Sequence, residues 1–133
     1  MDRVSVIPIV ETLGIRIDEF SEGTCTATVP RQRSYDGIYE SLHGGILMTI
    51  ADSIACFAIM THLGPDALLT TTDMNIRFLA PCLTDVSARA TVIKIGKTLC
   101  PVSVDLFDES GTKVAVAQVT YMRLSAMPRR PST

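Results

Sequence analysis

One carboxylate stands out because it lies in an otherwise apolar stretch of the chain. Asp52 is the only Asp, Glu, Lys or Arg within residues 44–62, where most side chains are aliphatic or aromatic. A carboxylate in such surroundings is costly unless it is hydrogen-bonded, ion-paired or placed in a water-bearing cleft. Two interpretations follow: an Asp held by neighbouring backbone or hydroxyl groups, and a general base or nucleophile at a cleft.

A second candidate group precedes this stretch, at His43-Gly44-Gly45. Glycines at a helix start let a ligand approach the backbone, and the free N–H groups there stabilise an anion or a polarised carbonyl oxygen. The alternative is a glycine-rich entry that permits close packing, with His43 as an ordinary polar residue.

The spacing of these groups bears on how they could cooperate. Gly45 and Asp52 are seven residues apart, so on a helix they share a face but lie about 10.5 Å apart along the axis. Each must approach its partner to about 3 Å, so one helix does not easily supply both groups to one carbonyl. Two helices that meet antiparallel across a two-fold axis would do so. The pattern therefore predicts an obligate dimer with two interfacial sites.

The element that carries Asp52 is predicted to be a helix from Gly44 to His62, ended by Gly64-Pro65. Its apolar residues cover every side, so it should be buried nearly all round. A membrane span is disfavoured, because a charge at its middle costs at least about 2.5 kcal/mol and no basic flank adjoins it.

The remaining elements are predicted to be strands, apart from a short helix over Val4–Leu13 that contains Pro8 and is closed by Gly14. The strand-like runs are Ile15–Asp18, Thr24–Val29, Leu69–Phe78, Val86–Ile95, Thr98–Phe107 and Lys113–Leu124. The last four are joined by short turns, Gly96-Lys97 among them, which implies antiparallel pairing. One buried helix against one large antiparallel sheet is an α+β architecture.

Residues 70–78 alternate in polarity. The alternation places Thr70, Thr72, Met74, Ile76 and Phe78 on a face that packs on the helix, and Thr71, Asp73, Asn75 and Arg77 in a polar row on the other face. That row would be solvated, line a groove or form a subunit interface.

Composition limits the class of protein. The 133 residues carry a formal charge of −2 without a basic stripe, which argues against nucleic-acid binding. We expect one domain over residues 1–124 and a flexible tail over 125–133, whose prolines and charges suit no packed element. The four cysteines form no CxxC pair, so no metal site is expected. Their use as small apolar residues, and a start without a signal-peptide pattern, predict the cytoplasm.

The motifs together resemble a known family. Leu42-His43-Gly44-Gly45, then Ala51-Asp52-Ser53, are similar to the signature of hot-dog-fold thioesterases of the PaaI type. Residues 71–78 and Gly96-Lys97-Thr98 also look like that family's strand and hairpin segments, so the resemblance covers residues 10–124.

The resemblance implies a hot-dog fold and hydrolysis of acyl- or aryl-acyl-CoA thioesters by homodimers that often pair into homotetramers. Asp52 would activate water or attack the thioester itself. Gly44, with Gly45, would polarise the thioester carbonyl through backbone N–H groups. His43 would orient this loop, and Thr71 would help to hold the water. The resemblance implies no metal or redox cofactor, with coenzyme A present only as part of the substrate.

The sequence departs from the family at one position. Many relatives carry Asn or Gln six residues before the histidine, where this chain has Gly37. Asp36 or Tyr35 would then take over part of that role, or the site is weakened. Two basic residues are also candidates for binding the substrate: Lys97 for a CoA phosphate and Arg77 for a ligand phosphate. The alternatives are a solvated lysine and an arginine paired within its own strand.

Two other functions stay open at this point. A hot-dog enoyl-CoA hydratase or dehydratase would use a His–carboxylate pair for proton transfer, and this chain has His43 and Asp52. A non-catalytic acyl-CoA or acyl-carrier binder is the other, because Gly37 replaces a supporting amide side chain.

Overall fold

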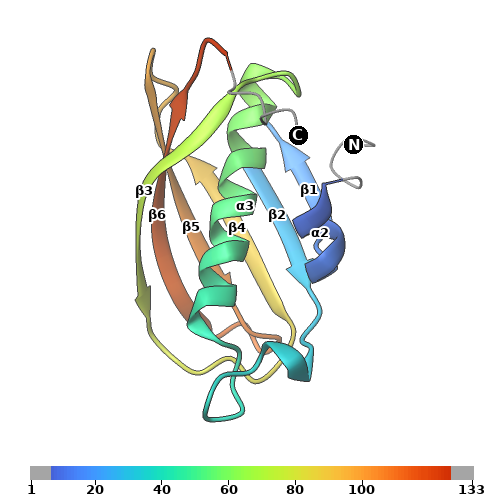
Figure 1. Ribbon diagram of the computed structural model, residues 1–133. Coiled ribbons are helices and arrows are strands. Elements are labelled where there is room, and N and C mark those ends of the chain that lie inside the picture. Colours follow the sequence, from blue (N-terminus) through green and yellow to red (C-terminus); the bar gives the residue numbers. More distant parts are fainter. Residues whose placement is uncertain (1–6, 127–133) are drawn as a thin grey trace, which may run out of the picture.

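A six-stranded antiparallel sheet curves around one long helix in the computed structural model, which describes residues 7–126 (Figure 1). In chain order the elements are α2 (Pro8–Leu13), β1 (Arg16–Ser21), β2 (Thr24–Val29), the 3-10 turn η1 (Arg33–Tyr35), α3 (Gly44–Leu63), β3 (Leu69–Phe78), β4 (Val86–Val92), β5 (Leu99–Phe107) and β6 (Lys113–Arg123). The strand order is β1-β2-β4-β5-β6-β3, and every neighbouring pair is antiparallel. The α+β prediction is confirmed.

Most predicted boundaries are within a residue of the observed ones, but β1 ends at Ser21 instead of Asp18 and β4 ends at Val92 instead of Ile95. β2 and β3 have the predicted bounds, and α3 ends one residue later than predicted. The β4–β5 connection is a loop over residues 93–98 instead of a tight Gly96-Lys97 turn. In this loop the Gly96 N–H donates to the Leu99 carbonyl at 3.1 Å, and a Cβ on Gly96 would lie 2.3 Å from that oxygen. Residue 96 must therefore be glycine, because any side chain would collide with the Leu99 carbonyl.

The predicted N-terminal helix is shorter than expected within the described residues. α2 begins at Pro8, where the missing N–H of proline costs nothing, and it ends at Gly14, whose φ is +70°. Val4, where the prediction began, and residues 127–133, which hold most of the predicted tail, lie outside the described residues.

The central helix α3 buries one side against the sheet and leaves the other half-exposed. Its buried residues are Leu47, Ile50, Ala51, Ile54, Ala55, Phe57, Ala58 and Ile59. The half-exposed side, which we call the open stripe, consists of Met48, Thr49, Asp52, Ser53, Cys56 and Met60. The prediction of burial nearly all round is therefore wrong for a single chain, because one sheet covers only one side of a helix. Although α3 is long and apolar enough to span a membrane, here it is the core helix of the sheet.

A bulge in β3 changes which residues face the helix. Thr71 pairs with Tyr121 and Asp73 pairs with Thr120, so Thr72 is the extra residue. The bulge shifts the alternation by one position and turns Thr71 toward α3, whereas strict alternation predicted it on the outer face. Thr72, which was predicted to face α3, is exposed and donates to the Thr120 carbonyl at 3.1 Å. The assignment of these two threonines from alternation is thus wrong.

Candidate active site

Two hydroxyl groups from adjacent strands converge on the Asp52 carboxylate. Thr71 Oγ1 on β3 donates to Asp52 Oδ1 at 2.7 Å. The Tyr121 hydroxyl on β6 lies 2.9 Å from the same oxygen and 2.7 Å from the main-chain carbonyl of Asp52. Within residues 7–126, Oδ2 accepts no hydrogen bond and no cation pairs with this carboxylate. One carboxylate oxygen is therefore fixed, and the other remains available on the open stripe.

The environment of Tyr121 keeps its hydroxyl protonated. The residue is only 6% exposed, and burial raises the pKa of Tyr121 well above its ordinary value, with the nearby Cys56 and Asp52 adding to the rise. The raised pKa keeps the phenol neutral, so Tyr121 is a hydrogen-bond partner for the carboxylate.

The start of α3 presents one unused backbone donor. His43 is the N-cap, and its Nδ1 accepts the Gly45 N–H at 2.8 Å. The N–H groups of Ile46 and Leu47 donate to the His43 carbonyl at 2.9 and 3.2 Å. Within the described part of the chain the Gly44 N–H has no partner. The N–H of Gly45, which the sequence suggested as a second donor to a bound carbonyl, is instead used by the cap.

A largely apolar cleft of about 470 Å³ opens beside this donor. It is lined by residues 78–82 at the end of β3, by Ser41 and Leu42, and by Gly44 and Leu47. The Phe78 ring lies against Gly44, so that a Cβ on Gly44 would be 3.0 Å from Phe78 Cζ. The absence of a side chain at Gly44 therefore leaves both the ring and the backbone donor in place.

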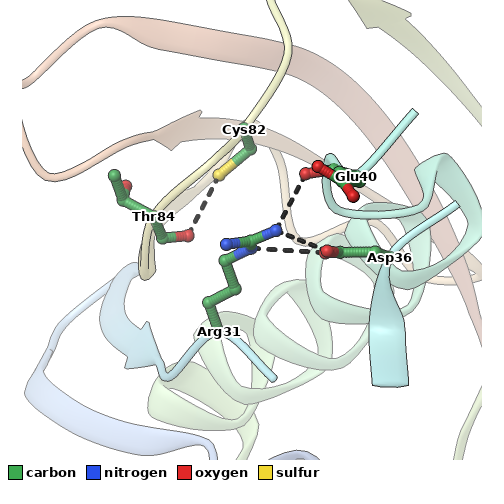
Figure 2. Close-up of polar contacts among 5 residues, drawn as sticks. All are labelled: Arg31, Asp36, Glu40, Cys82 and Thr84. Atoms are coloured by element: carbon green, nitrogen blue, oxygen red, sulfur yellow. Dashed lines mark hydrogen bonds and ion pairs between the residues drawn. The ribbon is translucent and has the colours of Figure 1, made fainter. Parts of the chain in front are cut away.

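The loop that leads into α3 is held by an arginine (Figure 2). Arg31 Nη2 and Nε both donate to the Asp36 carboxylate, the latter at 3.2 Å, and Nη2 also donates to the Glu40 carbonyl at 2.8 Å. The Asp36 side chain is only 9% exposed. Asp36 is thus committed to Arg31, and its carboxylate does not supply the polar group that the sequence lacks at position 37.

The other residues around position 37 are also engaged locally. The Tyr35 hydroxyl donates to the Thr12 carbonyl at 2.7 Å, so it is directed away from the helix start. The Gly37 N–H donates to the Ser41 carbonyl at 2.9 Å. A Cβ on Gly37 would make ordinary contact with His43 Cδ2 at 3.4 Å. The structure thus brings Gly37 beside His43 and leaves room there for a side chain.

Two predicted binding residues do not join this arrangement within one chain. Arg77 is the cross-strand partner of Val116 on β6. Its side chain is exposed, on the face of the sheet opposite to that of Ala117 and Tyr121. Lys97 is exposed in the loop between β4 and β5, at the end of the molecule away from the start of α3 (Figure 1). Neither lines the cleft beside Gly44.

Sequence reasoning missed Tyr121 and Arg31. Tyr121 lies among mostly apolar residues of β6, and its role becomes visible only because it is the cross-strand partner of Thr71. The signal for Arg31 was its charge and that of Asp36, five residues later in the same loop. Such a spacing predicts no contact, because it matches neither a helix nor a strand repeat. Among residues 7–126, no group of three His, Cys, Asp or Glu side chains is arranged to hold a metal ion.

Comparisons with known proteins place these features in a family context. A family model described as "Thioesterase superfamily" matches residues 39–115. Acyl-coenzyme A thioesterase 13 of Homo sapiens is 36% identical over 77 residues, which are 56% of this chain and 54% of that protein. A thioesterase family protein from Silicibacter pomeroyi matches with a TM-score of 0.85 and 28% identity, over 92% of this chain and 93% of that one. The PaaI protein of the E. coli phenylacetic acid degradation operon has the same fold, with a TM-score of 0.85 and 21% identity over 93% and 89% of the chains.

Proposed function

This chain belongs to the thioesterase superfamily and is a thioester hydrolase with the hot-dog fold, and we propose that it hydrolyses acyl- or aryl-acyl-CoA. The observation that carries the proposal is the Asp52 carboxylate, fixed through Oδ1 and open at Oδ2 on a half-exposed helix face. A relative named as an acyl-CoA thioesterase supports this class of substrate. The apolar cleft beside the unused Gly44 N–H suits an apolar group that follows a carbonyl.

The thioester carbonyl is bound by the Gly44 N–H in this proposal. That donor belongs to the first turn of α3, where the helix dipole also favours the negative charge that develops on the oxygen. Gly45 contributes its N–H to the His43 cap, so His43 acts by fixing the helix start. We therefore propose one backbone donor, Gly44, for the carbonyl.

Asp52 then supplies the base or the nucleophile. As a base, Oδ2 takes a proton from water while the water oxygen bonds to the carbonyl carbon, and the C–S bond breaks as the CoA sulfur receives a proton. As a nucleophile, Oδ2 bonds to the carbonyl carbon and expels the thiolate, and water cleaves the resulting anhydride. After a single turnover in H₂¹⁸O, label in Asp52 would identify the second route, because only an anhydride lets water attack the Asp52 carbonyl and leave ¹⁸O there.

The working unit is proposed to be a homodimer, with pairing of dimers into a homotetramer. Within one helix, Gly44 and Asp52 are eight residues apart, about 12 Å along the axis, too far to act on one carbonyl. The open stripe offers Met48, Cys56 and Met60 around Asp52 as an apolar surface for a second helix. Each site would combine Gly44 of one subunit with Asp52 of the other. A fully active monomer in analytical ultracentrifugation would contradict this arrangement.

We propose that the reaction needs no metal or redox cofactor, because a carboxylate and a backbone donor suffice for thioester hydrolysis. Coenzyme A enters only as part of the substrate. The cytoplasm is the proposed compartment, since the reduced, buried thiols of Cys25, Cys82 and Cys100 suit a reducing environment.

The test is thiol release from a panel of acyl- and aryl-acyl-CoAs by wild type, Asp52→Asn and a matched control. Glu19→Gln is the control, since it also converts a carboxylate to an amide but lies exposed on β1. We expect Asp52→Asn to lose at least about 100-fold in kcat, and Glu19→Gln to keep wild-type rates. Unchanged hydrolysis by Asp52→Asn would refute the role of Asp52. Saturable binding without thiol release by wild type would favour a binder, and hydration of an enoyl-CoA would favour a hydratase.

A further inference from the structure

The hydroxyl of Tyr121 bridges two acceptors that belong to the same residue. It lies 2.9 Å from Asp52 Oδ1 and 2.7 Å from the Asp52 main-chain carbonyl. A single group that contacts both the carboxylate and the main-chain carbonyl of one Asp restricts the χ1 and χ2 angles of its side chain together. Tyr121 is buried, so the hydroxyl is itself held in place.

The strand register reinforces this restriction. Thr71 on β3 and Tyr121 on β6 are direct cross-strand partners, so their hydroxyls reach α3 side by side. The bulge at Thr72 is what turns Thr71 to this face. Both hydroxyls contact the same oxygen, Oδ1, and Thr71 donates to it at 2.7 Å. The two strands therefore form a clamp on one side of the carboxylate.

From this geometry we propose that Tyr121 is a positioning residue for the reaction, holding Asp52 so that Oδ2 alone faces the substrate. The inference rests on the proposed thioesterase role of Asp52. Tyr121 does not touch the substrate; it acts through Asp52. Without the Tyr121 hydroxyl, Thr71 is the side-chain donor that remains to Asp52 among residues 7–126, and the carboxylate gains rotational freedom.

The experiment compares kcat, KM and thermal unfolding for wild type, Tyr121→Phe and Tyr35→Phe. Tyr35 is a matched control, because its hydroxyl also donates to a main-chain carbonyl, at 2.7 Å, but away from Asp52. For Tyr121→Phe we expect kcat about tenfold lower with KM within about twofold, since the substrate still binds while Asp52 is less well oriented. Tyr35→Phe should keep the wild-type kcat and KM.

The outcomes separate this proposal from the proposed function. If wild type releases no thiol, the proposed function fails. If wild type is active and Asp52→Asn is inactive, but Tyr121→Phe keeps the wild-type kcat, the positioning role is overturned alone. A lower melting temperature with unchanged kcat and KM would likewise assign Tyr121 a merely structural role. Should Tyr121→Phe fail to fold, Thr71→Val with Thr72→Val as its control tests the same clamp, and an unchanged kcat in Thr71→Val overturns it.

Discussion

Replacing Gly44 with alanine should impair catalysis without destabilising the fold. Gly44 is the first residue of α3 and has helical backbone geometry, so alanine suits its conformation. Alanine is favoured over glycine in helices by up to about 1 kcal/mol, and less at the first position. The free energy of unfolding should therefore stay the same or rise by a few tenths of a kcal/mol. Any loss of activity then has a local cause.

That cause is the Phe78 ring. A Cβ on residue 44 would lie 3.0 Å from Phe78 Cζ and 3.3 Å from Cε1, whereas ordinary carbon contacts begin at 3.4 Å. The ring or the helix start must therefore move by a few tenths of an ångström. Since a displacement near 1 Å at a reacting centre can cost about 100-fold, we expect this smaller movement to lower kcat/KM by roughly 4- to 10-fold. This corresponds to about 0.8–1.4 kcal/mol of transition-state stabilisation.

A double-mutant cycle tests this cause directly. Thiol release and thermal unfolding are measured for wild type, Gly44→Ala, Phe78→Ala and the double variant. Phe78 is 52% exposed, so its truncation opens the cleft at little cost to the core. The double variant should resemble Phe78→Ala in kcat/KM, because the clash is gone. Equal losses by Gly44→Ala with and without Phe78, or wild-type activity of Gly44→Ala, would refute the reasoning.

Two further predictions concern other parts of the chain. Gly37→Asn should fold normally, because a Cβ there makes only ordinary contact with His43. It should raise kcat/KM up to about tenfold if the side-chain amide supplies the missing polar group. Gly37→Leu is the matched control, and an equal gain in kcat/KM with leucine would contradict this reason. Burial raises the pKa of the Cys25 thiol from 9.0 to about 12, so its contribution to stability is complete below pH 9 and is lost as pH rises toward 12. In urea unfolding, the Cys25 thiol should therefore contribute about 2 kcal/mol less to the free energy of unfolding at pH 10.5 than at pH 8. The Cys25→Ala variant should lack this loss. An equal dependence of the free energy of unfolding on pH in both proteins would exclude this linkage.

The sequence predicted the elements well because their signals are local. The long helix follows from an apolar stretch between Gly44 and Gly64, and β3 follows from alternation ended by Ala80-Pro81. The side of β3 on which Thr71 lies could not be predicted, because a bulge depends on the register with β6. The extent of burial of α3 was overestimated for a related reason: counting apolar residues does not show how much of a helix a single sheet covers.

The site was predictable only in part, for the same physical reason. Asp52 and the glycines at the helix start are conspicuous by residue type, since a charge and flexible backbone are unexpected there. Tyr121 and Arg31 become functional candidates only through contacts with residues far along the chain or across a loop. Local patterns thus identify groups that could do chemistry, whereas tertiary contacts identify the groups that orient them.

The clamp on Asp52 and the proposed dimer are physically connected. In one chain Asp52 is half-exposed, and solvent can stabilise its charge. If a second helix covers the open stripe, the carboxylate loses much of that solvent, and burying an unpartnered carboxylate costs several kcal/mol. Hydroxyls from Thr71 and Tyr121 offset this cost on Oδ1, which is the oxygen directed to the sheet. The charge can then persist at a dry interface, where Oδ2 is left to act on the thioester.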